Sequence, residues 1–294
     1  MKRLIVNADD LGIGERISDA IFDCHANGIV TSATLMANMP AAEYACRRLQ
    51  EFSGLGVGIH LNLTQGMPLA SSSDVPDLVD EQGSFKRNVE QVQQLWRGDH
   101  IRAQVLRELS LQLEFALDHG VRPTHFDSHH GVQKRPLVRS VLIELARSRG
   151  VPAARTHRGR YWTATDAPAG IRLRHLALNA RNAHRIFMVW WNHARLNRAG
   201  VRTPDRKLTP DWLLPTPEGP RARLLATLTA MPPGTAELLA HPGYPDPEVV
   251  DSEFYAEARR IDTELMTDPE VREAIERAGI ELVHFGALAP APSA

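Results

Sequence analysis

The sequence is poor in cysteine, nearly balanced in charge and free of long apolar runs. Cys24 and Cys46 are its only two cysteines among 294 residues, too few for a disulfide framework in a chain of this size. The formal net charge of −1 provides no electrostatic basis for binding nucleic acid or an anionic membrane surface. No apolar stretch reaches the ~20 residues of a membrane span, and the three-residue apolar run 4–6 lacks the signal-peptide pattern. We therefore expect a globular protein located in the cytoplasm.

Short apolar segments alternate with amphipathic ones along the chain. The pattern predicts strands at 4–6, 29–36, 55–64, 151–155, 235–240 and 280–285. It predicts helices at 17–28, 40–52, 101–116, 135–149, 217–231, 252–266 and 271–278. This alternation is typical of an α/β fold with a parallel sheet. Because no linker divides the chain, we expect one domain over residues 1–286 and a disordered Ala/Pro tail over 287–294.

Two adjacent carboxylates, Asp9 and Asp10, follow the first predicted strand. Such a pair repels unless a cation or proton lies between the two groups, which indicates a metal ligand beside a general base. The alternative is a solvated strand-to-loop turn. Neighbours on a regular strand point to opposite faces, so both can reach one site only where the strand gives way to a turn, and Gly12 is suited to that turn.

Histidines follow or lie within three later strands. In 55–64 one face is apolar, and the other carries His60 beside Gly58, which leaves room next to the ring. In 121–133 an extended chain would place His125, Asp127 and His129 on one face. Two imidazoles and a carboxylate suit a divalent cation, with the carboxylate either binding it or orienting a ring. His241 follows the strand 235–240. Strand ends of a barrel meet at one face, so we expect these groups to converge.

Two segments are harder to interpret. The irregular stretch 65–97 predicts a long loop over one end of the barrel, where substrate contacts are common. The segment 159–212 is rich in arginine and tryptophan. We interpret its arginines as a solvated helix face rather than a nucleic-acid footprint. Its tryptophans are more typical of a core or of a subunit interface, such as that of a homodimer, than of sugar-stacking platforms.

Four blocks in the sequence carry a resemblance to a known family. They are NADDLG (7–12), GIHLNLT (58–64), THFDSHHGVQ (124–133) and ELLAHPGY (237–244). In this order they resemble the signature blocks of the YdjC-type carbohydrate deacetylases, which include chitooligosaccharide deacetylase and hopanoid-biosynthesis-associated deacetylase-like proteins. The resemblance implies an irregular, TIM-like (β/α) barrel related to the polysaccharide deacetylases. It also implies a hydrolase that removes acetyl from an N-acetylated sugar or oligosaccharide.

The resemblance also implies roles for individual residues. Asp10, His60 and His129 would hold one divalent metal ion, with Asp9 as general base and His241 as general acid. Such a ligand set suits Mg²⁺ or Zn²⁺ and also Mn²⁺, Fe²⁺ or Ni²⁺. Substrate contacts are expected from Asp127, His125, Asp205 and Tyr244, with Asp205 in a loop similar to one near the family's site. Gly131 and Gln133 stand where the family usually has histidines, which leaves the identity of the substrate open.

Two other functions fit the same residues. A metal-dependent phosphoesterase acting on a sugar phosphate would use similar ligands, but such enzymes commonly bind two metal ions with more carboxylates. A sugar-binding family member without activity is the third possibility, suggested by Gly131 and Gln133. The metal-to-protein ratio separates the first two hypotheses, and acetate release from N-acetylated glycans tests the third.

Overall fold

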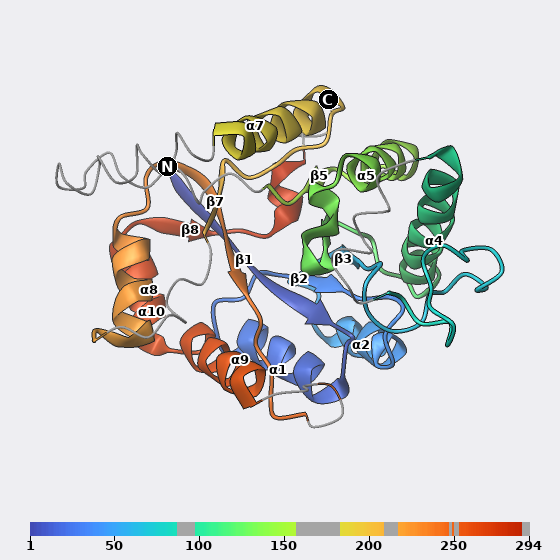
Figure 1. The fold of residues 1–294 in the computed structure, drawn as a ribbon. Coiled ribbons are helices and arrows are strands. Elements are labelled where there is room, and N and C mark those ends of the chain that lie inside the picture. Colours follow the sequence, from blue (N-terminus) through green and yellow to red (C-terminus); the bar gives the residue numbers. More distant parts are fainter. Residues whose placement is uncertain (87–97, 157–182, 209–216, 247–248, 250–252, 290–294) are drawn as a thin grey trace.

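The computed structural model describes residues 1–86, 98–156, 183–208, 217–246, 249 and 253–289 (Figure 1). Its strands form one parallel sheet in the order β5-β4-β3-β2-β1-β7-β6, with β8 also paired to β1. The strands are β1 (Lys2–Leu11), β2 (Ser32–Leu35), β3 (Gly56–Leu61), β4 (His125–Ser128), β5 (Ala153–Ala154), β6 (Arg206–Leu208), β7 (Gly234–Ala240) and β8 (Ile280–Leu282).

Strand β1 lies at the centre of this sheet. One of its edges pairs with β7 from Lys2 to Ala8. Its other edge pairs first with β8 and then, from Asn7 onward, with β2. The strand is buried from Leu4 to its end, which explains the continuous apolar run that begins it. This position brings the Asp pair that ends β1 into the middle of the molecule.

Helices cover the outer face of the sheet (Figure 1). Leu4, Val6 and Ala8 of β1 point outward into the main hydrophobic core, together with apolar residues of the flanking helices. The helices are α1 (Glu15–Ala26), α2 (Ala42–Arg48), α4 (Asp99–Asp118), α5 (Pro136–Arg149), α7 (Ala183–Arg198), α8 (Gly219–Thr229), α9 (Glu253–Met266) and α10 (Pro269–Arg277), with 3-10 turns at Leu49–Glu51 (η1), His129–Lys134 (η3) and Phe285–Leu288 (η5).

The sheet curls until strands that are distant in its order face each other. Arg155, just after β5, lies 2.5 Å from Glu237 of β7. In a flat sheet these strands would be separated by roughly 24 Å, at about 4.8 Å per strand. Ile5 of β1, Ala153 of β5 and Phe285 also pack together inside the curl. The predicted α/β barrel is therefore confirmed, and its interior is lined by alternate residues of the strands.

The structure differs from the expected elements in a few places. Strand β6 and helix α7 lie within 159–212, the segment to which the sequence pattern assigned no elements. Trp190 and Trp191 of α7 are 41% and 45% exposed, which rules out the core interpretation for these two residues. Phe285–Leu288 forms a 3-10 turn, and this turn includes residues 287 and 288 of the expected disordered tail. Tyr161, Trp162 and Trp212 lie outside the described residues, as do 290–294.

No helix in the described parts of the chain has the length and apolar character needed to cross a membrane.

Candidate active site

A bulge near the end of β1 turns Asp9 and Asp10 toward the same site. Ala8 pairs with Ala33 and Leu11 with Leu35, so β1 has one more residue than β2 between these pairs. The bulge accommodates this extra residue by placing Asp10 in a left-handed backbone conformation, with φ of 70°. The expected turn is thus a bulge within the strand rather than its end. Both carboxylates are almost fully buried.

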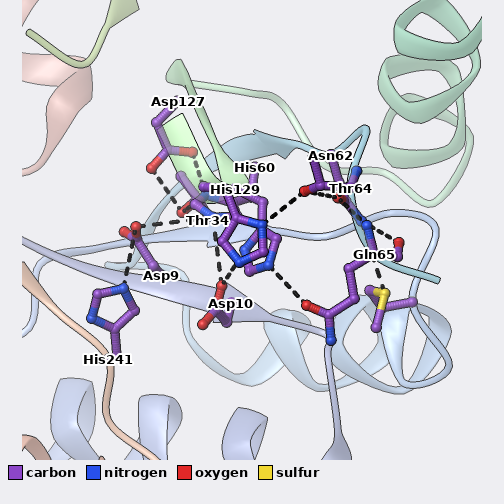
Figure 2. A network of polar contacts seen from close by, with 12 residues as sticks. Asp9, Asp10, Thr34, His60, Asn62, Thr64, Gln65, Asp127, His129 and His241 are labelled. Carbon is purple, nitrogen blue, oxygen red and sulfur yellow. Dashed lines mark hydrogen bonds and ion pairs between the residues drawn. The ribbon is translucent and has the colours of Figure 1, made fainter. Parts of the chain in front are cut away.

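Asp10, His60 and His129 converge on one point in the barrel (Figure 2). Oδ1 of Asp10 lies 3.2 Å from Nδ1 of His129 and 3.5 Å from Nε2 of His60. One ligand atom from each residue lies within 4.8 Å of the others. Oδ1 of Asp10 is buried and has no hydrogen-bond partner. A buried carboxylate oxygen without a donor is costly, so this arrangement suits a cation.

Neighbouring acceptors orient both imidazoles toward that point. Nδ1 of His60 lies 2.6 Å from Oδ1 of Asp127, and Nε2 of His129 lies 2.8 Å from Oε1 of Gln65. Because both partners are acceptors, these nitrogens carry ring protons. The opposite nitrogens face Asp10 and, once deprotonated, would direct lone pairs to a bound cation. Thr34 donates to the second oxygen of Asp127. Such outer partners commonly fix metal-ligating histidines.

The electrostatic environment of His60 also favours a bound cation. Burial lowers the pKa of His60, but Asp127 and Asp9 outweigh it and raise the pKa to about 9. The negative charge that attracts a proton to this ring would equally attract a divalent metal ion. Metal binding at this site would then release that proton.

Arg155 bridges the buried carboxylates that lie next to the point where Asp10, His60 and His129 converge. Its guanidinium donates to both oxygens of Asp9, at 2.5 and 2.7 Å, and lies 2.9 Å from Asp127. Its Nε donates to Glu237 of β7. Burial raises the pKa of Asp9, but the Arg155 charge outweighs it and holds the pKa well below its usual range. Asp9 is therefore held as an anion.

A second possible ligand group, formed by Asp9, His60 and Asp127, overlaps the first. Arg155 already supplies a cation to both of its carboxylates. His60 directs Nδ1 to Asp127 and Nε2 to Asp10, so its metal-facing nitrogen is committed to the first group. The geometry thus favours one metal ion rather than two.

His241 approaches Asp9 from the turn that follows β7. Its Nε2 lies 3.9 Å from Oδ2 of Asp9, and its side chain is partly exposed (Figure 2). Helix α9 anchors this turn: Asp262 accepts from the His241 backbone N–H, and Thr263 accepts from that of Gly243. Desolvation lowers the pKa of His241, against the raising effect of Asp9 and Asp10. The expected acid and base are therefore neighbours.

His125 and Asp127 were expected to contact substrate, but each lies within the protein interior. His125 is fully buried and stacks on Phe285, with ring centroids 3.6 Å apart. A Cβ at Gly58 would lie 2.4 Å from this ring, so the space left by Gly58 is filled by His125 and is not open beside His60. Asp127 is also fully buried, between His60 and Arg155. It is placed to orient the site rather than to meet substrate.

Asp205 and Tyr244 also have other partners. Asp205 accepts from the backbone N–H of Thr235, at the start of β7, which is the end opposite His241. The structure therefore does not bring Asp205 to the site. Tyr244 donates its hydroxyl to Asp23, and this bond raises the pKa of Tyr244 to about 12.

The stretch after His129 departs from the expected extended chain. His129 begins the 3-10 turn η3, in which His130 and Gly131 have φ of 49° and 65°. Gly131 thus occupies a left-handed conformation that favours glycine over histidine. Gln133 is buried, and its Nε2 lies 3.4 Å from the backbone oxygen of Arg155.

Several residues of the site were missed by the sequence analysis. They are Thr34, Gln65, Arg155, Glu237 and Arg259, whose partners lie on other strands or helices. Arg155 did carry one signal, because it is the last residue of the predicted strand 151–155 and so stands at a strand end, where the Asp pair and His241 were also expected.

Comparisons with known proteins agree with this fold and identify the family. The chain is 35% identical to a carbohydrate deacetylase of Geobacillus stearothermophilus, over 96% of both chains. It is 30% identical to a carbohydrate deacetylase of Thermoanaerobacter pseudethanolicus, over 98% of this chain and 100% of the other. A crystal structure from Enterococcus faecalis, of a protein described as a candidate for cellobiose-phosphate cleavage, superposes with a TM-score of 0.74 at 27% identity, covering 98% of this chain and 99% of that one. A model of YdjC-like proteins matches residues 3–277. The chain belongs to the YdjC-like protein family.

Proposed function

We propose that this protein is a metal-dependent hydrolase that removes the acetyl group from an N-acetylated carbohydrate. The observation that carries the proposal is the meeting of Asp10, His60 and His129 around a buried carboxylate oxygen that has no hydrogen-bond partner. The full-length similarity to carbohydrate deacetylases supports the class of substrate.

Oδ1 of Asp10, Nε2 of His60 and Nδ1 of His129 would hold the metal ion. This mixed set of nitrogen and oxygen ligands suits Zn²⁺ or Mg²⁺ and also accommodates Mn²⁺, Fe²⁺ or Ni²⁺. When bound, the ion would polarise the acetyl carbonyl and acidify the attacking water. Arg155 already pairs with both carboxylates of the overlapping ligand group, which supports a one-metal hydrolase over the two-metal phosphoesterase alternative.

Asp9 and His241 would move the protons of the reaction. Arg155 keeps Asp9 ionised, so the form that accepts a proton from water is always present. Oδ1 of Asp9 accepts from both Arg155 and Asn7, whereas Oδ2, the oxygen on the His241 side, accepts from Arg155 alone and so has a lone pair left to receive that proton. His241 is partly exposed on the same side and would protonate the leaving amine. General acid–base catalysis of this kind contributes typically ~10²–10⁴-fold.

Acetate release tests the proposal. The full-length protein, loaded in turn with each candidate metal, would be incubated with N-acetylglucosamine and with chitooligosaccharides of increasing length. Sugar phosphates would be assayed in parallel for phosphate release. We expect acetate from at least one N-acetylated sugar, one metal ion per chain, and no acetate from His129→Ala. Phosphate release with two metal ions per chain would favour the phosphoesterase instead.

A further inference from the structure

Helix α9 brings an arginine to the carboxylate that would hold the metal ion. Nη2 of Arg259 donates to Oδ2 of Asp10 at 2.5 Å. The Arg259 side chain is only 13% exposed, and among the described ion pairs Asp10 is its partner. The two residues are 249 positions apart in the sequence, so this contact exists only in the folded barrel.

This contact makes the two oxygens of Asp10 different. Oδ2 is occupied by the guanidinium, whereas Oδ1 has no hydrogen-bond partner and faces His60 and His129. Oδ1 is thus the one oxygen of Asp10 that is not already paired with a guanidinium.

The path of Arg259 to Asp10 depends on Gly243 in the turn after β7. A Cβ built at Gly243 would lie 2.9 Å from Cδ of Arg259 and 3.3 Å from its Cβ. Any larger residue at 243 would therefore displace the arginine stem. This contact gives the glycine of the HPGY block a physical role at the site.

The same helix also holds the His241 turn. Asp262 and Thr263, a few residues after Arg259, accept from the backbone N–H groups of His241 and Gly243. Helix α9 therefore places Arg259 on Asp10 and His241 near Asp9 as one unit.

We propose that Arg259 is a positioning residue for the metal centre: it occupies Oδ2 of Asp10 and so limits Asp10 to one-oxygen ligation through Oδ1. This inference rests on the metal centre of the proposed function. It assigns Arg259 no contact with substrate.

Metal binding tests this inference without relying on turnover. Metal-depleted full-length protein would be titrated calorimetrically with Zn²⁺, and the Co²⁺-loaded protein examined by visible absorption, whose intensity falls as the coordination number rises. We compare Arg259→Met, which keeps the stem, with Arg259→Lys, which keeps the charge. Arg260→Met is the matched control, because Arg260 is a solvent-exposed neighbour on the same helix that pairs with Glu257 and Glu264.

Arg259→Met should bind Zn²⁺ about 10- to 100-fold more weakly, as is usual when an outer partner of a metal ligand is lost. Its Co²⁺ absorption should weaken because both oxygens of Asp10 become available. Arg259→Lys should restore most of the affinity, and Arg260→Met should match the wild type. Gly243→Ala, which retains the charge but displaces the guanidinium, should change both readouts in the same direction as Arg259→Met.

Unchanged or tighter Zn²⁺ binding by Arg259→Met, with an unaltered Co²⁺ spectrum, would overturn the inference and leave the metal centre standing. If Arg259→Met does not fold, wild-type affinity and spectrum in Gly243→Ala would overturn it instead. Asp10→Asn serves as the reference without the metal centre. If the wild-type protein binds Zn²⁺, Mn²⁺ and Mg²⁺ no better than Asp10→Asn does, the metal centre and this inference are overturned together.

Discussion

His60 and Asp127 are direct partners across strands β3 and β4, and their side chains meet at 2.6 Å inside the barrel. The register of the two strands therefore sets the orientation of a proposed metal ligand. A slip of β4 against β3 by one residue would turn Asp127 to the outer face and leave His60 without this partner. The orientation of His60 is in this sense a property of the sheet and not of a loop.

Asp127→Asn should weaken metal binding. The amide still accepts from His60, but it loses the charge that favours this proton position and offers Arg155 an N–H group in place of an oxygen. We expect a loss of roughly 10-fold in Zn²⁺ affinity, measured by competition with a chelator. Asp118→Asn, at the exposed end of α4, serves as the control. Equal affinities in the two variants would contradict an orienting role for Asp127.

Asp9→Asn should separate catalysis from metal binding. Asp9 lies beside the proposed ligands but its oxygens are bound by Arg155 and Asn7. We expect Zn²⁺ affinity within a few-fold of the wild type and a kcat lower by ~10²–10⁴-fold. The measurements are metal content and acetate release at saturating substrate. Near-normal turnover would exclude Asp9 as the general base.

Arg155→Met should destabilise the whole barrel. It leaves the buried carboxylates of Asp9, Asp127 and Glu237 without their shared cation. Removing one partner of a buried ionic group typically costs about 3–5 kcal/mol of unfolding free energy, measured here by urea denaturation. Arg48→Met breaks a more exposed pair with Asp19 and should cost less than about 1 kcal/mol. A similar loss in both variants would argue against the hub role of Arg155.

His125 should make the protein less stable in mild acid. Burial lowers the pKa of His125 to about 3, from 6.5. Between these values the unfolded chain binds a proton that the folded protein does not, so stability falls as the pH drops below 6.5. The loss from pH 7 to pH 5 should be about 2 kcal/mol in unfolding free energy.

A variant isolates this contribution of His125. In His125→Phe, which keeps an aromatic ring against Phe285, the difference in unfolding free energy between pH 7 and pH 5 should shrink by the same amount. His119→Phe, at the end of α4, controls for the loss of a histidine. An undiminished pH dependence in His125→Phe would show that this ring is protonated in the folded state.

Strand alternation correctly predicted the faces of several site residues. The apolar face of 55–64 packs outward through Val57, Ile59 and Leu61, while His60 points inward. The same two-residue period placed Asp127 inside the barrel. These predictions succeeded because the facing of a strand residue is a local property once one face is apolar.

The remaining features depend on contacts that no local pattern contains. The pairing of Arg155 with Asp9 and of Arg259 with Asp10 spans 146 and 249 residues. Arg259 does not differ locally from a solvated helix arginine, and the strand-end position of Arg155 does not reveal its partners. The left-handed conformation of Asp10 is likewise a consequence of pairing between β1 and β2. Asp205 was wrongly expected at the site because it directly precedes β6 and lies beside the start of β7, not at the end of a strand.

The central position of β1 has a consequence for biosynthesis. Its partners β7 and β8 begin at Gly234 and Ile280, so a nascent chain on the ribosome exposes an unpaired edge of its first strand until nearly all of the protein has been made. Such long-range parallel pairing folds slowly and leaves apolar edges open to other chains. Efficient production of this enzyme should therefore benefit from low temperature or from chaperones that shield the early strands.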